Sequence, residues 1–427
     1  MRFYRQSYSK KLPKNRYAEY LPFKGSNDKI IDEGIAIYFQ KPHSYTGEDV
    51  LEFQCHGGSV VLDLLLNEIL KSGLARQAQA GEFTERAFLN GKIDLTQAEA
   101  IADLINATSE KAAISAINSL QGAFSNKIKE LNEKLIKLRT YVEATIDFPD
   151  ESIDFIDDGQ VLIGLNELTK ELEAIRKTAN QGVLLQEGLR IVIAGQPNAG
   201  KSSLLNLLSG KESAIVTDIA GTTRDVLKEQ INIDGMPLHI IDTAGLRNHT
   251  NDIVEKIGID RAWKEIETAN RILFVFDSTQ KDYEEQINLF NLIKDKTNNK
   301  IAFSIIYNKL DLVTDFVPPK EFTDIASIKI SAKDANSLDV IKEHLKQCAG
   351  YDNSTEGVFS ARRRHIVSLQ KAEDHIQTAI ELIQNQSMFE LSAEELRSTQ
   401  QCLNEILGEY TADDLLGNIF NTFCVGK

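Results

Sequence analysis

The sequence predicts a multidomain protein that combines α/β and all-α parts. From about residue 189, five apolar strand-like runs alternate with helical segments, which indicates a parallel-rich sheet with helices on both faces. Helical patterns flank this block on both sides, so we expect one helical domain, formed by two chain segments, with the α/β unit inserted between them. The first 90 or so residues mix short strands with one apolar helix and predict a small α+β domain.

Shifts in this pattern set the expected domain limits. We predict an N-terminal α+β domain over 1–91, the first half of the helical domain over 92–188, the α/β domain over 189–354, and the second helical half over 355–427.

Each element follows from its local pattern. In the first domain "RYAEYLPF", "GIAIYF" and "DVLEFQC" are strand-like, and "SVVLDLLLNEILKSG" is an apolar helix. The next segment contains one apolar helix face, formed at three- and four-residue steps by Ile128, Leu131, Leu135, Leu138 and Val142. The strands of the α/β block are "RIVIAG", "LHIIDTAG", "RILFVFD", "IAFSIIYN" and "SIKIS". After about residue 355 the pattern is helical again, starting with "ARRRHIVSLQKAEDHIQTAIELI".

Composition excludes several classes of protein. The 63 Asp and Glu outnumber the 48 Lys and Arg, and the net charge of −15 argues against a broadly basic face that coats nucleic acid. The four cysteines lie far apart and form no CxxC pair, so we expect neither a disulfide framework nor a zinc site. No apolar run approaches the ~18 residues of a membrane span. We therefore expect a cytoplasmic protein with no membrane partner.

Two charged runs allow two interpretations each. The acidic stretch "DFPDESIDFIDD" could attract a metal or a basic partner, or it could be a solvated connector. The run "RRRH" (362–365) could contact nucleic-acid phosphates, or it could be a solvated, helix-pairing run at a helix start.

The stretch "GQPNAGKS" (195–202) lies between the strand "RIVIAG" and the helix "SSLLNLLSG", and it is a G-x-x-x-x-G-K-S phosphate loop in its required setting. Gly195 and Gly200 allow backbone N–H groups to surround phosphates at a helix N-terminus. Lys201 offers a charge to the β- and γ-phosphates, and the Ser202 hydroxyl can bind Mg²⁺.

Three later motifs predict that the base is guanine. In "DTAG", Asp242 can hold Mg²⁺ through water and the Gly245 N–H can meet the γ-phosphate. In "NKLD", Asp311 can accept hydrogen bonds from two guanine N–H groups that adenine does not present in this pattern, while Asn308 and Lys309 brace the loop. In "SAK" (331–333) the backbone N–H of the alanine can reach the guanine carbonyl. Their order and strand-end placement argue against an ATPase.

The catalytic residues are less obvious. Leu246 stands where a Ras-type site has the glutamine that orients water, so another group must do so. The segment "TDIAGTTRD" (217–225) is the expected Mg²⁺-sensing switch, with Thr223 as ligand. Arg224 could offset transition-state charge, or it could be a solvated arginine in a loop.

The phosphate loop, "TDIAGTTRD", "DTAGLR" and the closing "FCVGK" together resemble the MnmE (TrmE) family of tRNA-modification GTPases, as do "GEFTERAFLNGKIDLTQAEAIADLI" and "LQGAFS". The resemblance runs from about residue 11 to 427. It implies an N-terminal α+β folate-binding domain and an inserted Ras-like P-loop G domain. It also implies GTP hydrolysis aided by K⁺, which sits where an arginine finger would otherwise act, with the G domains of two subunits paired across it.

The resemblance assigns site residues by motif. The K⁺ ligands fall on Asn198, Thr217, Ile219 and Thr222, and the family's water-positioning glutamate falls on Glu255. The implied GTP site consists of Asn198, Ala199, Gly200, Lys201, Ser202, Ser203, Thr217, Asp218, Ile219, Ala220, Gly221, Thr222, Thr223, Asp242, Thr243, Ala244, Gly245, Asn308, Lys309, Asp311, Ser331, Ala332 and Lys333.

The resemblance also implies a second site and several partners. The N-terminal domain of the family mediates homodimerisation and binds a tetrahydrofolate derivative, 5-formyl- or methylene-tetrahydrofolate, with ligands falling on Glu52, Lys92 and Lys427. Cys424 is implicated in the modification chemistry. With a flavoprotein of the MnmG type, which carries FAD and forms a heterotetramer with it, the family adds an aminomethyl-type (carboxymethylaminomethyl) group to carbon 5 of the wobble uridine of certain tRNAs.

One departure from the family bears on that second site. Family members have one further strand-and-helix segment, with a glycine-rich turn, before "KLPKNRY", and we expect this sequence to lack it. The absence of this segment would weaken the expectation that the N-terminal domain binds folate and mediates dimerisation.

Two other functions share parts of this pattern. A ribosome-assembly or RNA-binding GTPase of the Era or Der type has the same G domain, but a KH module would require a GxxG loop in a basic C-terminal domain. A nucleotide-stabilised scaffold would predict no GTP turnover. For Cys424, "CVGK" does not fit a prenylation box, which leaves a packing cysteine or a catalytic one.

Overall fold

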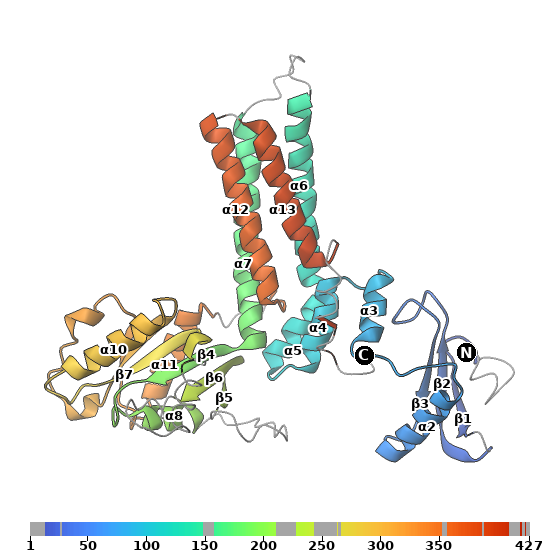
Figure 1. Cartoon of the computed structure of the whole chain (residues 1–427), viewed down its shortest axis with the longest axis horizontal. Helices are drawn as coiled ribbons and strands as arrows, with labels where there is room; N and C mark the ends of the chain where they lie inside the picture. Colours follow the sequence, from blue (N-terminus) through green and yellow to red (C-terminus); the bar gives the residue numbers. More distant parts are fainter. Residues whose placement is uncertain are drawn as a thin grey trace. The chain divides into compact units, whose positions relative to one another are not determined.

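The computed structural model divides into two compact units. Figure 1 shows its helices and strands. One comprises Met1–Ala102, Leu120–Leu168 and Lys371–Lys427, and the other comprises Asp103–Ser119 and Thr169–Gln370. Within these spans the described residues are 13–25, 28–147, 158–210, 228–242, 263, 266–351, 357–386, 388–409, 419–420 and 423. Four helices contribute residues to both units: α4 (Leu95–Ile105), α5 (Glu110–Leu120), α7 (Asp158–Glu187) and α12 (Arg363–Gln386).

The first unit begins with a small antiparallel sheet. Its strands are β1 (Ala18–Lys24), β2 (Ile30–Phe39) and β3 (Val50–Gln54), in that order in the sheet. All three strands were expected from the sequence. Because side chains alternate along a strand, Phe23, Ala36 and Phe53 share one face. The helix α2 (Ser59–Lys71) packs on that face through Leu65.

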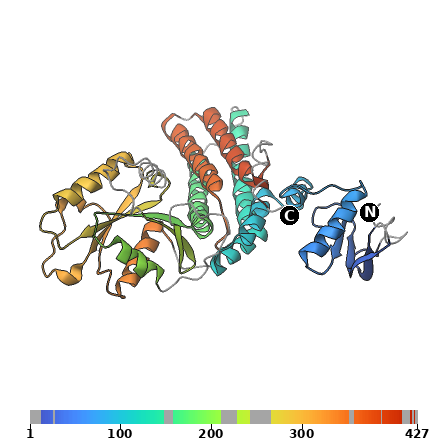
Figure 2. The same cartoon turned by 60° about the horizontal axis from the view of Figure 1, so that its bottom comes forward.

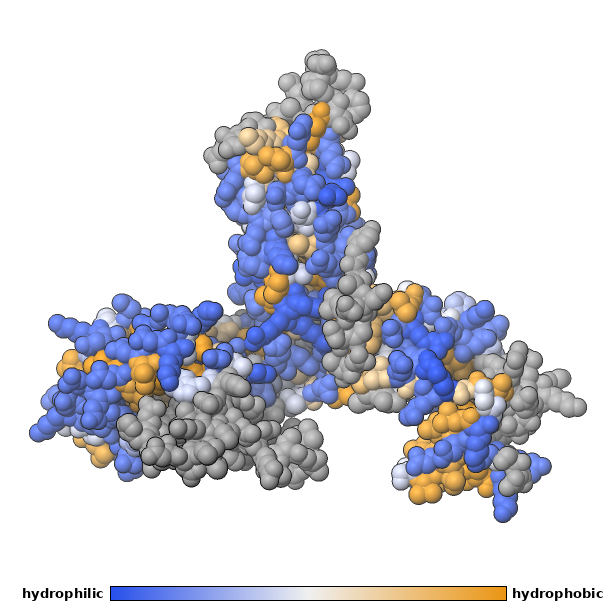
Figure 3. Space-filling view, in the orientation of Figure 1, coloured by the Kyte–Doolittle hydropathy of each residue, from blue (hydrophilic) through white to orange (hydrophobic). Residues whose placement is uncertain are grey.

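Helix α2 is apolar around much of its circumference. Leu65 is buried, but four other aliphatic side chains of the helix are exposed: Val60, Leu62, Leu64 and Leu66. Figure 3 shows apolar surface over this part of the chain. The short helix α3 (Glu82–Leu89) follows.

The other described elements of the first unit are helices. The helices α6 (Ala123–Asp147) and α13 (Phe389–Leu407) lie side by side (Figures 1 and 2), and Asn132 Nδ2 donates to Asn404 Oδ1 across them at 2.9 Å. The face that the sequence predicted for α6 is buried at Ile128, Leu131 and Val142. Because α6 and α13 come from opposite sides of the α/β block, the helical part is formed by two chain segments, as predicted.

The second unit contains a six-stranded sheet in the order β5-β6-β4-β7-β8-β9. Its strands are β4 (Leu189–Ala194), β5 (Lys228–Ile233), β6 (Met236–Asp242), β7 (Arg271–Asp277), β8 (Ala302–Asn308) and β9 (Ser327–Lys329). All neighbouring pairs are parallel except β5 with β6. The prediction of a parallel-rich sheet is confirmed.

Strand β5 was not predicted from the sequence. This strand forms a hairpin with β6 through Asp234 and Gly235, whose φ values of 52° and 97° are those of a two-residue primed turn. The Asp-Gly pair between "INI" and "MPLHI" was the signal for it.

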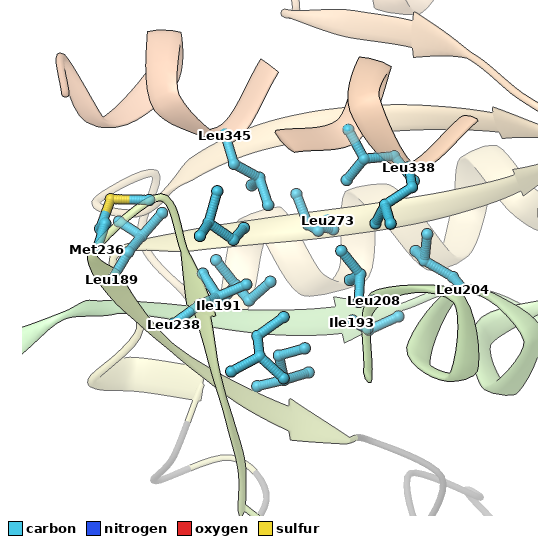
Figure 4. Packing of buried hydrophobic residues seen from close by; sticks show 14 of the residues in the cluster. Leu189, Ile191, Ile193, Leu204, Leu208, Met236, Leu238, Leu273, Leu338 and Leu345 are labelled. Atoms are coloured by element: carbon cyan, nitrogen blue, oxygen red, sulfur yellow. The ribbon is translucent and has the colours of Figure 1, made fainter. Parts of the chain in front are cut away.

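Both faces of this sheet are covered. Figure 4 shows the cluster on one face, where Ile191, Ile193 and Leu273 pack against α8 (Lys201–Ser209) and α11 (Ser337–Ala349). On the other face Phe274 and Phe276 pack with residues of α10 (Glu284–Lys296). Two short 3-10 helices, η1 (Leu310–Leu312) and η2 (Lys320–Phe322), follow β8. In the part of the chain that is described, no helix is long and apolar enough to cross a membrane.

The arginine run at the start of α12 forms ion pairs within the second unit. Arg362 Nη2 lies 3.0 Å from Asp103 Oδ1, and Arg363 Nε lies 3.0 Å from Glu187 Oε2. These contacts agree with the helix-pairing interpretation of the run.

Candidate nucleotide-binding site

The phosphate loop joins the end of β4 at Ala194 to the start of α8 at Lys201. Gly200, the N-cap residue of α8, has a φ of 101°, a conformation that L side chains rarely adopt. A Cβ atom on Gly200 would also collide with the side-chain amide of Asn308. Only glycine fits here, and the first N–H groups of the helix are left without a side-chain cap. Such a helix start favours an anion.

Side chains at the start of α8 complete the loop. The ammonium group of Lys201 donates to the carbonyl oxygens of Gly195 and Gln196 at 2.9 and 2.8 Å, so this side chain arches over the loop. Ser202 and Ser203 occupy the first turn of α8 and are exposed, while Ala199 is buried. The arrangement presents backbone N–H groups, one ammonium group and hydroxyls at one helix end.

Asn308 connects this loop to the end of β8. Its Nδ2 donates to the carbonyl oxygen of Ala199 at 2.8 Å, and its Oδ1 accepts from the backbone N–H of Ala332 at 2.9 Å. The residue is 2% exposed. One amide therefore fixes the phosphate loop, the end of β8 and the "SAK" segment together.

The next residues along the chain form the predicted base loop. Lys309 has a left-handed backbone with a φ of 65°, and its Nζ lies 2.7 Å from Asp277 Oδ2 at the end of β7. Burial raises the pKa of the Asp277 carboxyl, but hydrogen bonds from Lys309 and Thr279 outweigh it and hold that pKa below its usual value. Asp311 follows in η1 and faces the same pocket.

A pocket of about 210 Å³ lies where these segments meet. It is lined by residues of the phosphate loop, the base loop and the "SAK" segment: Gly200, Ser203, Asn308, Lys309, Asp311, Leu312, Ser331, Ala332 and Lys333. The structure thus brings together residues that are more than a hundred positions apart in the sequence. Polar groups with donors and acceptors at fixed positions suit a planar base with several N–H and carbonyl groups.

The structure describes only some of the other residues predicted for this site. Asp242 is the last residue of β6 and pairs in register with Ile193 of β4, which places its backbone beside the start of the phosphate loop. Asn198 is exposed in that loop with a φ of 63°. The following predicted residues lie outside the described part of the chain: Thr217, Asp218, Ile219, Ala220, Gly221, Thr222, Thr223, Arg224, Thr243, Ala244, Gly245, Glu255, Cys424 and Lys427.

The two described residues of the predicted folate site belong to the first unit. Glu52 is exposed on β3, on the sheet face opposite α2. Lys92 follows α3 and its Nζ donates to the carbonyl oxygen of Pro42 at 3.1 Å. Both side chains are accessible, and the third predicted ligand, Lys427, is among the residues that are not described.

Sequence reasoning missed two residues near the nucleotide pocket. Leu312 lines it, and Asp277 contacts Lys309. Asp277 lies at the carboxyl end of a buried parallel strand, where ligand sites of such sheets occur, and this position was the available signal.

A strand, a glycine-rich loop and a helix starting with Lys-Ser, at the carboxyl ends of a parallel-rich sheet, define a P-loop nucleotide-binding protein. The family model described as "MnmE helical domain" matches residues 95–424, and the one described as "GTP-binding protein TrmE N-terminus" matches residues 2–92. A curated relative, the tRNA modification GTPase MnmE of Vibrio parahaemolyticus serotype O3:K6 (strain RIMD 2210633), is 56% identical over 417 residues, covering 98% of this chain and 92% of the relative. The chain belongs to the MnmE/TrmE family.

Solved structures give weaker likenesses. A variant of SsGBP is 20% identical with a TM-score of 0.30, covering 44% of this chain and 70% of its own. A variant of Aquifex aeolicus Era bound to GDP and aluminium fluoride is 22% identical with a TM-score of 0.29, covering 44% of this chain and 66% of its own.

Proposed function

We propose that this protein is a potassium-activated GTPase that acts with a flavoprotein partner in the cytoplasm. Together they would add an aminomethyl-type (carboxymethylaminomethyl) group to carbon 5 of the wobble uridine of certain tRNAs. Membership of this family shows that the chain is a GTP hydrolase acting in tRNA modification. The observation that carries it is the 56% identity to a tRNA modification GTPase over 98% of the chain.

The pocket supports guanine as the base. A carboxylate such as Asp311 accepts two N–H groups from the guanine edge, which adenine does not present in this pattern. The backbone N–H of Ala332 lies in the pocket lining and donates to Asn308 Oδ1 at 2.9 Å, so on nucleotide binding it would share this hydrogen between Asn308 and the guanine carbonyl. Lys309 would cover one face of the base through its aliphatic stem.

The phosphate loop supports binding of the triphosphate. The first N–H groups of α8 and the Lys201 ammonium would hold the β- and γ-phosphates, and the helix end would favour their negative charge. Since these groups are fixed before the nucleotide arrives, they would stabilise charge that develops during hydrolysis without reorganising.

The residues present fit the metal ions of the proposal. The exposed Ser202 hydroxyl at the first turn of α8 would hold Mg²⁺ together with Thr223, and the exposed Asn198 amide oxygen would hold K⁺. When bound, these cations would offset charge on the phosphates in place of an arginine finger. Glu255 would orient the attacking water and Arg224 would assist, both from outside the described residues.

The modification site is proposed on the first unit. The exposed carboxylate of Glu52 and the accessible ammonium of Lys92 fit the polar groups of a tetrahydrofolate derivative, and Lys427 and Cys424 would complete the site. FAD would be supplied by the partner, and a homodimer would join two flavoprotein subunits. Folate titration of the full chain tests this site, and a Glu52→Gln variant with unchanged folate affinity would contradict it.

The GTPase proposal is tested by GTP turnover in KCl and in NaCl at equal ionic strength, measured as phosphate release. We expect turnover to be at least about tenfold faster in KCl, since one transition-state charge contact of this kind contributes a few kcal/mol. Equal rates in the two salts would remove the potassium mechanism. No turnover in either salt would remove the enzyme itself.

A further inference from the structure

Asp277 at the end of β7 has its backbone fixed by a buried side chain. Its N–H donates to Gln286 Oε1 at 2.8 Å, and its carbonyl oxygen accepts from Gln286 Nε2 at 3.1 Å. Gln286 lies in α10 and is fully buried. Its amide satisfies backbone groups at the point where β7 ends, so the position of Asp277 is set independently of the residues that follow it.

The carboxylate of Asp277 is oriented as well. Oδ1 accepts from the backbone N–H of Thr279 at 3.0 Å and from its hydroxyl at 2.6 Å. Oδ2 accepts from Lys309 Nζ at 2.7 Å. The Asp277 side chain is 7% exposed and that of Lys309 is 28% exposed, so the contact is largely shielded from water. Charge-assisted hydrogen bonds of this kind are stronger than neutral ones.

The same network reaches the phosphate loop. Gln286 Nε2 also donates to Gln280 Oε1 at 3.1 Å, and Gln280 Nε2 donates to Gln196 Oε1 at 3.3 Å. Lys309, at the other end, holds a left-handed backbone that a residue with a side chain adopts only at a cost. A contact that fixes its side chain helps to keep that conformation populated.

We propose that Asp277 is a positioning residue for base recognition. It holds Lys309, and through it the loop that carries Asp311, in the conformation that receives guanine. The inference rests on the proposed function, because it assumes that a guanine nucleotide occupies this pocket. Asp277 acts through Lys309, so its loss should weaken nucleotide binding and leave phosphate chemistry unchanged.

The test is Asp277→Asn in the full chain. The substitution keeps the shape and the Oδ1 acceptor for Thr279, but it turns an N–H₂ group toward the Lys309 ammonium. We expect the Kd for GDP and the KM for GTP to rise about tenfold or more, while kcat at saturating GTP stays within about twofold. GDP binding is measured by calorimetry and turnover by phosphate release.

Asp234→Asn is the matched control. Asp234 Oδ2 lies 2.9 Å from Lys346 Nζ, in the β5–β6 turn and away from the pocket lining. We expect no change in GDP affinity for this variant. If it weakens GDP binding as much as Asp277→Asn, loss of any aspartate–lysine pair in this unit suffices and the positioning role is overturned.

A double-mutant cycle with Lys309→Met tests whether Asp277 acts on GDP binding through Lys309. If Asp277 acts through Lys309, adding Asp277→Asn to Lys309→Met weakens GDP binding by less than about twofold further. Additive losses would mean that Asp277 acts by another route.

Should Asp277→Asn not fold, Thr279→Val removes only the hydroxyl that orients Oδ1. A few-fold loss of GDP affinity in this variant supports the inference. An unchanged GDP affinity overturns it.

These measurements distinguish loss of the role of Asp277 from loss of the proposed function. If the wild-type chain does not bind GDP, both fall together. If it binds GDP and hydrolyses GTP with potassium stimulation, but Asp277→Asn keeps wild-type affinity and KM, only the role of Asp277 is lost.

Discussion

At the scale of single residues, Asn308 connects two loops that the chain places far apart. Its carboxamide uses both ends, donating to the Ala199 carbonyl oxygen and accepting from the Ala332 N–H. Removing it would leave a buried acceptor and a donor without their partner. Unmade buried hydrogen bonds typically cost about 1–3 kcal/mol each.

For Asn308→Ala we therefore expect the free energy of unfolding of the second unit to fall by about 2–4 kcal/mol, with weaker GDP binding. Urea unfolding can be followed by fluorescence of Trp263, the only tryptophan of the chain, which packs against the aromatic core of this unit. Asn291→Ala, at an exposed position of α10, is the control. Equal stability of the two variants would contradict the bridging role.

A second prediction concerns pH. His344 is buried, with Nε2 2.8 Å from Ser304 Oγ and 3.5 Å from Cys348 Sγ. Burial, and then the charge of Arg271, lower its pKa from the ordinary 6.5. The unfolded chain therefore takes up this proton first as pH falls. The stability that His344 contributes is complete above about pH 6.5 and declines below it, by up to about 1.4 kcal/mol per pH unit.

Urea unfolding of the wild type and of His344→Gln at pH 7, 6 and 5 checks this, again through Trp263 fluorescence. We expect the difference in unfolding free energy between the two proteins to shrink as pH falls. A constant difference across the three pH values would show that His344 titrates alike in both states. Lys300→Gln, at an exposed position of the second unit, controls for substitution by glutamine.

At the scale of elements, α7 shows how a glycine in a helix can be required by packing. A Cβ atom on Gly182 would overlap the Phe359 carbonyl oxygen and lie 2.9 Å from the Ala361 backbone nitrogen. The segment before α12 thus approaches the backbone of α7 directly. Helix propensity alone would favour alanine at this position by about 1 kcal/mol.

We expect Gly182→Ala to destabilise the second unit by about 1–3 kcal/mol, because backbone atoms cannot move aside cheaply. Thermal unfolding measures it. Gly164→Ala on the same helix is the matched control, because its Cβ would meet only the flexible side chain of Leu138 at 3.1 Å. A stabilised Gly182→Ala would show that propensity outweighs the contact.

Local sequence patterns predicted most elements, because a phosphate loop, an apolar strand and an amphipathic face are each encoded within a few residues. The strands β4, β6, β7, β8 and β9 were all expected. The strand β5 was missed because its apolar alternation is short, although Asp234 and Gly235 marked its turn. Local patterns marked Asp277 only by its position at the end of a buried strand. Its contact with Lys309, and the role of Gln286, could not be found this way because they depend on contacts between different elements.

At the scale of the whole molecule, the two compact units should respond differently to nucleotide. The pocket-lining residues all belong to the unit that contains Thr169–Gln370. A ligand stabilises the part of the chain that binds it, by about 2.7 kcal/mol at a hundred times its Kd.

We therefore expect two thermal transitions, with GDP and Mg²⁺ raising only the one that Trp263 reports. Trp263 fluorescence and far-ultraviolet circular dichroism, recorded with and without GDP, distinguish the transitions. ADP at the same concentration is the control ligand. A single transition that moves as a whole with GDP would show that the units unfold together.

Helix α2 has a consequence for how firmly the start of the chain is held. Among the described residues, the cluster beneath this helix is centred on Phe23, Ala36 and Leu65, while Val60 and Leu64 remain in water. Because Val60 is 69% exposed and Leu64 is 50% exposed, each leaves half or more of the roughly 1.5–3 kcal/mol of full burial unrealised. The amide hydrogens of β1–β3 would then exchange with solvent through local opening. Their exchange would be much faster than that of the amide hydrogens in the six-stranded sheet.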